Sequence, residues 1–92
     1  MPSSRAPRLS TAANGRVGLR FTSSVGLAWL RWKLRLLHGF HAEGKSIRGL
    51  GESIVPDLVR GELRLEGGCD ELGPYLLSAN EASDDFLRRL AQ

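Results

Sequence analysis

The fold depends most on how the segment from residue 25 to residue 41 is assigned, because its pattern fits both a strand and a helix. Apolar and basic residues alternate strictly over residues 30–36, which is the period of a half-buried strand. Residues 27–45 contain no β-branched side chain and are rich in Leu, Ala, Arg and Trp, which favours a helix. We therefore predict a helix over 25–41 that ends at Gly39 or Gly44. The leucines that follow helical spacing are Leu27, Leu30, Leu34 and Leu37.

The rest of the chain predicts three short strands and irregular connections. Apolar residues alternate with polar or small ones over 16–21 and again over 62–66. A third strand over 75–77 follows a glycine-rich turn and is expected to pair back as a hairpin. Residues 44–59 contain three glycines and Pro56, so we expect irregular structure there.

Residues 81–90 predict a second helix. Acidic residues occupy its first turns and arginines its last, which complements the helix dipole. Ser78 has capping-box spacing to Glu81, and Asn80 is an alternative N-cap. The expected buried stripe of this helix consists of Ala82, Phe86 and Leu90.

These elements predict an α+β fold in the order β-α-β-β-α. We expect a two-layer sandwich, in which helices cover one face of a small antiparallel or mixed sheet. The chain has 92 residues, which suits a single domain over 16–92. Residues 1–15 are rich in turn formers and predict a flexible basic N-terminal tail. Cys69 is the only cysteine, so no disulfide forms within the chain.

Charge divides the chain into two halves. Residues 1–48 contain nine Arg or Lys and one acidic residue, whereas residues 49–92 contain four basic and nine acidic residues. Such asymmetry is typical of a surface for nucleic acid or anionic lipid. It is equally consistent with two halves that attract each other within one fold or across a dimer.

A run of tryptophan and basic residues is the strongest functional signal. Such a mixture stacks on bases and meets phosphates, lies in a membrane interface, or forms the centre of a protein interface. The alternative is that both tryptophans pack in the core and the arginines are simply solvated. The predicted binding residues, for a protein interface or nucleic acid, are Arg20, Trp29, Arg31, Trp32, Lys33 and Arg35.

The segment from residue 39 to residue 46 matches the spacing of a phosphate-binding loop. The matching residues are Gly39, Gly44, Lys45 and Ser46. A functional loop of this kind follows a buried strand and begins a helix, whereas here the next residues are punctuated by glycines and Pro56. We therefore interpret the segment as the exit of the preceding helix.

The remaining reactive side chains predict neither a metal nor a cofactor site. His38 and His41 are three residues apart, and Glu43 or Cys69 would be needed to complete a metal site, so the pattern is weak. No stretch has the length and hydropathy of a membrane span, and the first fifteen residues lack the apolar core of a secretory signal. With eleven Arg and two Lys, the composition suits a bacterial protein, which we place in the cytoplasm.

The sequence thus predicts a small bacterial binding or regulatory module that acts through protein–protein contacts, with a homodimer as one form. The absence of a convincing catalytic pattern disfavours an enzyme. An alternative is a nucleic-acid-binding protein that uses segment 16–35, and a third is a small nucleotide-binding enzyme that uses residues 39–46. Contact with a membrane surface is not expected.

Overall fold

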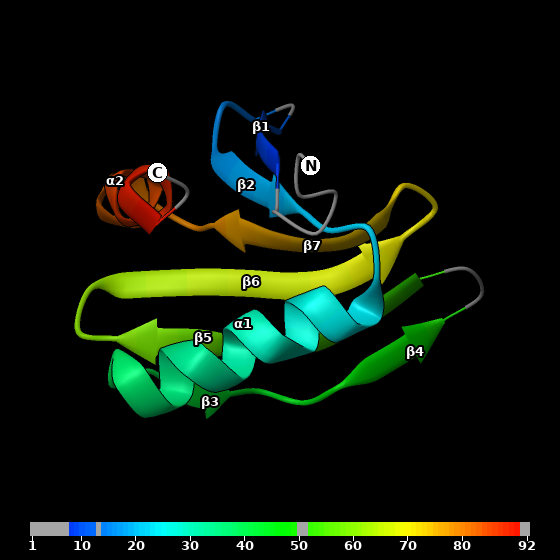
Figure 1. Ribbon diagram of the computed structural model, residues 1–92, viewed down its shortest axis with the longest axis horizontal. Coiled ribbons are helices and arrows are strands. Elements are labelled where there is room, and N and C mark those ends of the chain that lie inside the picture. The colour runs from blue at the N-terminus through cyan, green and yellow to red at the C-terminus, as the bar shows by residue number, and fades with distance from the viewer. Residues whose placement is uncertain (1–7, 13, 50–51, 91–92) are drawn as a thin grey trace, which may run out of the picture.

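A seven-stranded antiparallel sheet forms the framework of the protein (Figure 1). The computed structural model describes residues 8–12, 14–49 and 52–90. The strand order across the sheet is β1-β2-β7-β6-β5-β3, and β4 pairs with β5 on the same side as β3. In chain order the elements are β1 (Arg8–Thr11), β2 (Val17–Arg20), α1 (Ser24–Leu37), β3 (His41–Glu43), β4 (Ile47–Gly49), β5 (Glu52–Arg60), β6 (Leu63–Asp70), β7 (Gly73–Ser78) and α2 (Glu81–Leu90).

The core lies between the two helices and one face of the sheet. Leu19 of β2 pairs with Leu76 of β7, and Leu58 of β5 pairs with Leu65 of β6. Directly opposed residues of antiparallel strands project to the same face, so these leucines share one side of the sheet. Leu34 of α1 and Leu87 of α2 belong to the same buried cluster. In Figure 1, α1 crosses in front of β5 and β6, whereas α2 lies near the end of β7.

Local signals set the limits of α1. The side chain of Ser23 accepts a hydrogen bond from the amide of Gly26, which caps the first turn. After the helix, Gly39 adopts a left-handed conformation with φ of 74°, and the amide of Phe40 donates to the carbonyl of Leu34 at 3.1 Å. Glycine tolerates this conformation without strain, so the chain turns away here. The predicted helix is confirmed, and of the two predicted ends the structure uses Gly39, not Gly44; α1 is shorter than 25–41, because His41 already belongs to β3.

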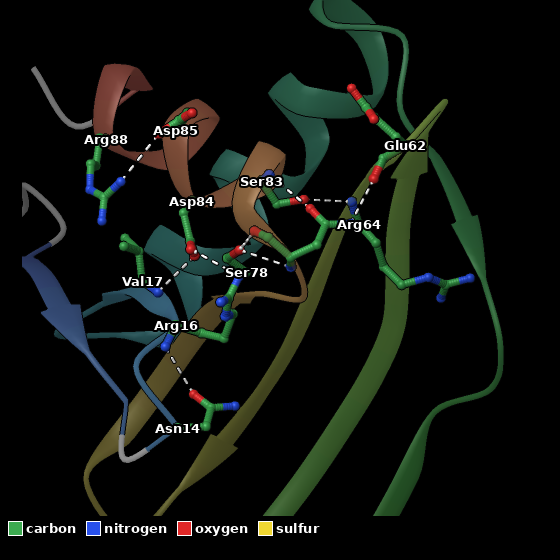
Figure 2. Close-up of polar contacts among 11 residues, drawn as sticks. Asn14, Arg16, Val17, Glu62, Arg64, Ser78, Ser83, Asp84, Asp85 and Arg88 are labelled. Carbon is green, nitrogen blue, oxygen red and sulfur yellow. Dashed lines mark hydrogen bonds and ion pairs between the residues drawn. The ribbon is translucent and has the colours of Figure 1, made fainter.

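Two buried polar residues attach α2 to the sheet (Figure 2). The carboxylate of Asp84 accepts a hydrogen bond from the amide of Val17 in β2 at 2.9 Å and pairs with Arg16 at 3.1 Å. The hydroxyl of Ser83 accepts a hydrogen bond from the amide of Arg64 in β6 at 2.8 Å. Both bonds are long-range, and together they position α2 across β2 and β6.

The capping alternatives for α2 are resolved in favour of Asn80. Its side-chain oxygen accepts a hydrogen bond from the amide of Ser83 at 2.9 Å, which is the geometry of an N-cap. The hydroxyl of Ser78 instead donates to the carbonyl of Asn80. The predicted helix over 81–90 is confirmed, but its expected buried stripe was wrong: Ser83, Asp84 and Leu87 are buried, whereas Ala82, Phe86 and Leu90 are only partly buried.

The predicted fold class was wrong. The sheet has seven strands and is the dominant part of the structure, and its order departs from β-α-β-β-α because five strands separate the two helices. The segment 44–59 was expected to be irregular, yet it contributes β4 and most of β5. Pro56 lies where the pairing of β5 with β6 shifts register, between Val55 and Leu58. A proline lacks an amide proton, so a bulge accommodates it without loss of a ladder bond.

Two further boundaries differ from the prediction. Residues 67–70 were expected in a turn but belong to β6. The glycine at 68 marks close packing within the sheet, because a Cβ there would collide with the carbonyl of Ser53 and approach the hydroxyl of Tyr75 to 2.8 Å. Part of the expected tail, Arg8–Thr11, forms β1 and pairs with β2. All four residues of β1 are exposed, so no alternation of apolar residues marked it. Residues 1–7 of that expected tail lie outside the described residues.

Candidate functional site

The face of α1 that points away from the sheet carries a continuous apolar stripe. Its four members follow the spacing i, i+4, i+7, i+11, which places them on one line along a helix. They are among the most exposed large apolar side chains of the described residues, whereas Leu27 and Leu34 on the opposite side are buried. We call this line the outer stripe; it consists of Val25 (76% exposed), Trp29 (59%), Trp32 (53%) and Leu36 (61%).

The two tryptophans form the centre of the outer stripe. Their ring centroids are 5.2 Å apart and the rings are inclined by 22°, so they stack on the helix surface. The alternative in which both tryptophans pack against the sheet was therefore wrong. Each ring keeps more than half of its surface exposed, and exposed aromatic surface of this size is typical of a contact site.

The predicted basic residues separate into two groups. Arg20 lies on the sheet face away from the helices, where it binds the carboxylate of Asp70 at 2.7 Å and lies over the ring of Tyr75. The hydrogen bond with Asp70 raises the pKa of Arg20 and lowers the pKa of Asp70. Arg20 is thus engaged within the fold and does not join the tryptophans.

The other three cations flank the outer stripe. Arg35 is exposed and lies one helical turn after Arg31 on the same flank. Arg31 is half-buried and donates to the carbonyl of Pro56 in β5 at 2.9 Å. Burial lowers the pKa of Arg31, and the nearby charge of Arg35 lowers it further. Lys33 lies on the opposite flank.

A hollow lies on each side of α1. The larger, of about 770 Å³, opens between α1 and β2, and its lining includes Leu19, Phe21, Trp29 and Lys33. We call it the β2-side hollow. The second, of about 440 Å³, lies between α1 and strands β5 and β6, and we call it the β6-side hollow. Its lining includes Arg31, Trp32, Arg35, Ser53, Val55 and Cys69.

Charge is polarised along α1. The helix itself contains no acidic residue, and its cations all lie in its second half. The turn between β6 and β7 lies beside its first turn (Figure 1), where the amide of Phe21 donates to the carbonyl of Pro74 at 3.0 Å. This turn contributes exposed Glu71 and the 75% exposed Leu72, whereas the adjacent Asp70 of β6 is paired with Arg20 on the other face of the sheet. We call this the acidic turn; its one carboxylate, Glu71, therefore lies near the start of the outer stripe, and basic side chains flank the second half.

The phosphate-loop match does not adopt the required geometry. Gly39 and Gly44 both have positive φ, and between them the chain forms edge strand β3. Lys45 and Ser46 lie in an exposed connection to β4, where a phosphate loop would begin a helix. The predicted interpretation as a helix exit agrees with Gly39 ending α1.

The histidines serve separate contacts. His38 meets the ring of Phe86 edge-on, whereas His41 bonds Glu43 at 2.9 Å. This bond lowers the pKa of Glu43, with a further contribution from Arg64. Within the described ranges, no three His, Cys, Asp or Glu side chains gather as metal ligands would. None of the helices in these ranges has the length and hydropathy needed to cross a membrane.

Sequence reasoning found the centre of the site and its end at Leu36 but missed its beginning. Trp29 and Trp32 were singled out, but Val25 was not, although its spacing to them marked the same line. The acidic turn at Glu71 carried no sequence signal for proximity, because more than forty residues separate it from the N-terminal half of α1. Comparison of the chain with known protein families, curated proteins and solved structures finds no match. The function therefore has to be argued from the site itself.

Proposed function

We propose that this protein is a protein-binding module whose outer stripe docks a second copy of the chain. The observation that carries the proposal is the line of exposed apolar side chains centred on the Trp29–Trp32 stack. Monomeric proteins rarely leave such a contiguous apolar surface in water, because its burial is favourable. Aromatic side chains are also enriched at the centres of protein interfaces.

The spacing of the stripe suits pairing of two helices. Alternating steps of four and three residues produce the seam by which helices pack at a small crossing angle. A two-fold axis near the Trp29–Trp32 stack would align α1 antiparallel to its copy. This arrangement places each stripe against the other and opposes the two helix dipoles.

Charge favours the same antiparallel arrangement. In one copy the acidic turn at Glu71 stands at the start of α1, and Lys33 and Arg35 lie in its second half. Antiparallel pairing brings the acidic turn of each copy beside the basic half of the other. Complementary potentials of this kind fix the register of association more than its affinity.

Nucleic acid is the second candidate, because Lys33 and Arg35 flank an exposed aromatic stack. The other predicted phosphate contacts are engaged elsewhere. Arg16 pairs with Asp84, Arg20 with Asp70, and Arg31 bonds a backbone carbonyl. Fewer free cations support this function than the sequence predicted, so we place it after protein binding. In either case we propose a cytoplasmic location, where the free thiol of Cys69 would remain reduced.

Sedimentation velocity from about 1 to 100 μM tests the proposal. The chain should be a dimer at micromolar concentration, and Trp32→Arg should weaken dimerisation about 30-fold or more, because it places a charge in the apolar centre. Ile47→Arg is the matched control, since Ile47 is equally exposed (59%) but lies on β4, away from α1. It should leave the dimer intact.

A charge exchange tests the orientation. Glu71→Lys and Arg35→Glu should each weaken the dimer, and the double variant should recover most of the loss. A monomer at every concentration would overturn the proposal. A monomer that binds duplex DNA, with affinity that falls steeply as salt rises, would support the nucleic-acid function instead.

A further inference from the structure

The β6-side hollow gathers two guanidinium groups without a carboxylate to balance them. Arg31 and Arg35 both line it, one helical turn apart on the same flank of α1. Among the described residues, no carboxylate oxygen lies within ion-pair distance of either group. Two arginines on the opposite face of the sheet differ: Arg20 and Arg64 each bind at least one carboxylate.

The guanidinium of Arg31 is fixed by the fold, but the fold uses only part of its hydrogen-bonding capacity. Its guanidinium is half-buried above Gly67, where a Cβ would approach it to 3.4 Å, and one nitrogen donates to the carbonyl of Pro56. A guanidinium has five N–H donors, so this bond leaves others free. Burial and the neighbouring charge of Arg35 lower the pKa of Arg31, and the charge of Asp57 offsets this only in part. An anion between the two groups would relieve both effects.

The remaining walls of the hollow define the body of such an anion. Trp32 and Leu27 of α1 and Val55 of β5 supply apolar surface, and Ser53 and Cys69 supply one hydroxyl and one thiol. The volume of about 440 Å³ is within the range of small-molecule sites. A planar ring lies well against an indole, and a carboxylate matches the fork of a guanidinium.

We propose that the β6-side hollow is a binding site for a small aromatic carboxylate. Its carboxylate binds Arg31 and Arg35, and its ring packs between Trp32 and Val55. This inference does not rest on the proposed dimer, because Ser53 and Cys69 lie beside the outer stripe and take no part in the proposed pairing. Trp32 and Arg35 are used by both proposals, so the variant that separates them is at Ser53, which only the anion site uses.

The first measurement compares two probes of the same shape. Calorimetric titration with 2-naphthoate and with neutral 2-naphthamide isolates the contribution of the charge. The carboxylate should bind about tenfold or more tightly than the amide, since it forms charge-assisted hydrogen bonds. Its binding should shift the backbone NMR resonances of Ser53 and Cys69. Equal affinities for the two probes, or no binding of either, would overturn the proposal.

Matched variants locate the site. Arg35→Gln should remove most of the preference for 2-naphthoate, whereas Lys33→Gln removes an equal charge from the other flank of α1 and should not. Loss with Lys33→Gln alone would assign the probe to the β2-side hollow and overturn the inference. Ser53→Leu fills the hollow from β5 and should abolish binding. Ser53→Leu should still form the dimer in sedimentation. Loss of probe binding with the dimer retained, or loss of the dimer with probe binding retained in variants that keep Trp32, tells the failure of one proposal from the failure of the other.

Discussion

Removal of the Asp84 carboxylate should destabilise the protein strongly, because this one side chain links α2 to the start of β2 by a hydrogen bond and an ion pair. Asp84 is 5% exposed, and its oxygens bind the amide of Val17 at 2.9 Å and the guanidinium of Arg16 at 3.1 Å. Figure 2 shows the carboxylate pointing from α2 towards the first residue of β2. Asp84→Ala leaves the buried amide of Val17 without an acceptor.

The magnitude follows from these two contacts. An unsatisfied buried amide costs about 1–3 kcal/mol, and the partly exposed pair with Arg16 contributes up to about 1 kcal/mol. We expect Asp84→Ala to lower the free energy of unfolding by about 1–4 kcal/mol. For a domain of this size that corresponds to a melting temperature lower by roughly 5–30 °C. Since small domains are stable by about 5–15 kcal/mol in total, the loss is large but leaves a folded protein.

Two matched variants separate the contributions. Asp84→Asn retains an oxygen that accepts from Val17 and loses the charge, so it should cost about 1 kcal/mol. Asp85→Ala changes the next residue, which is 71% exposed and pairs only with Arg88 within the helix. That variant should change stability by less than about 0.5 kcal/mol.

Urea unfolding followed by far-ultraviolet circular dichroism measures these differences. Tryptophan fluorescence is less suitable, because both indoles are already exposed in the folded state. All variants should be compared at one protein concentration, since any dimerisation adds to the apparent stability. A loss below about 0.5 kcal/mol for Asp84→Ala, or equal losses at residues 84 and 85, would refute the argument.

Two other outcomes follow from the same contacts and from the packing of β6. Burial acts to raise the pKa of Asp84, but the Val17 amide, the Ser78 hydroxyl and the Arg16 charge outweigh it and hold the pKa below its usual value. The stabilisation by the Asp84 carboxylate is therefore present above the unfolded-state pKa of about 3.9 and is lost as the pH falls through the folded-state pKa. Urea titrations from pH 5 to pH 2 should show a steeper loss of unfolding free energy for the wild type than for Asp84→Asn. Gly68→Ala should cost about 1–3 kcal/mol by overpacking against Ser53 and Tyr75, while Gly49→Ala, whose nearest new contact is at 3.9 Å, should cost less than half of that; equal unfolding midpoints would contradict the packing argument.

Both helices were predictable because their signals are local. The cap at Ser23, the glycine after α1 and the charge distribution of α2 all lie within a few residues of the helix ends that they set. Such interactions depend on sequence neighbours, so a single sequence contains them. The same holds for the hairpin of β6 and β7, whose strands follow each other directly.

The extent of the sheet was not predictable for a physical reason. β4 pairs with β5, and β5 pairs with β6, so these strands join segments that are neighbours in the chain. Pro56 and the glycines near them nevertheless resemble turn signals until the bulge and the close approach of Tyr75 to Gly68 are known. β1 has one apolar residue in four and is stabilised by backbone pairing with β2. Pairing of this kind leaves no period in the side chains.

The site could be predicted in part, because α1 has an apolar arc wider than a single packing surface requires. Half of that arc, including Leu27 and Leu34, is buried in the core, and the other half forms the outer stripe. The sequence alone does not distinguish the two halves, since both consist of large apolar residues at helical spacing. The position of the sheet decides which half remains exposed.

The two sides of the molecule differ in whether their basic side chains form ion pairs with carboxylates. On the sheet face away from the helices, Arg20 binds Asp70, and Arg64 binds both Asp57 and Glu43. On the α1 side, Arg31, Lys33 and Arg35 have no carboxylate partner among the described residues, and they border the largest exposed aromatic surface there. Unbalanced charge beside exposed apolar surface is costly in the isolated chain and becomes favourable once a complementary surface covers it. The α1 side is therefore the side on which the proposed binding of a second copy or of an anion would yield the greater gain in free energy.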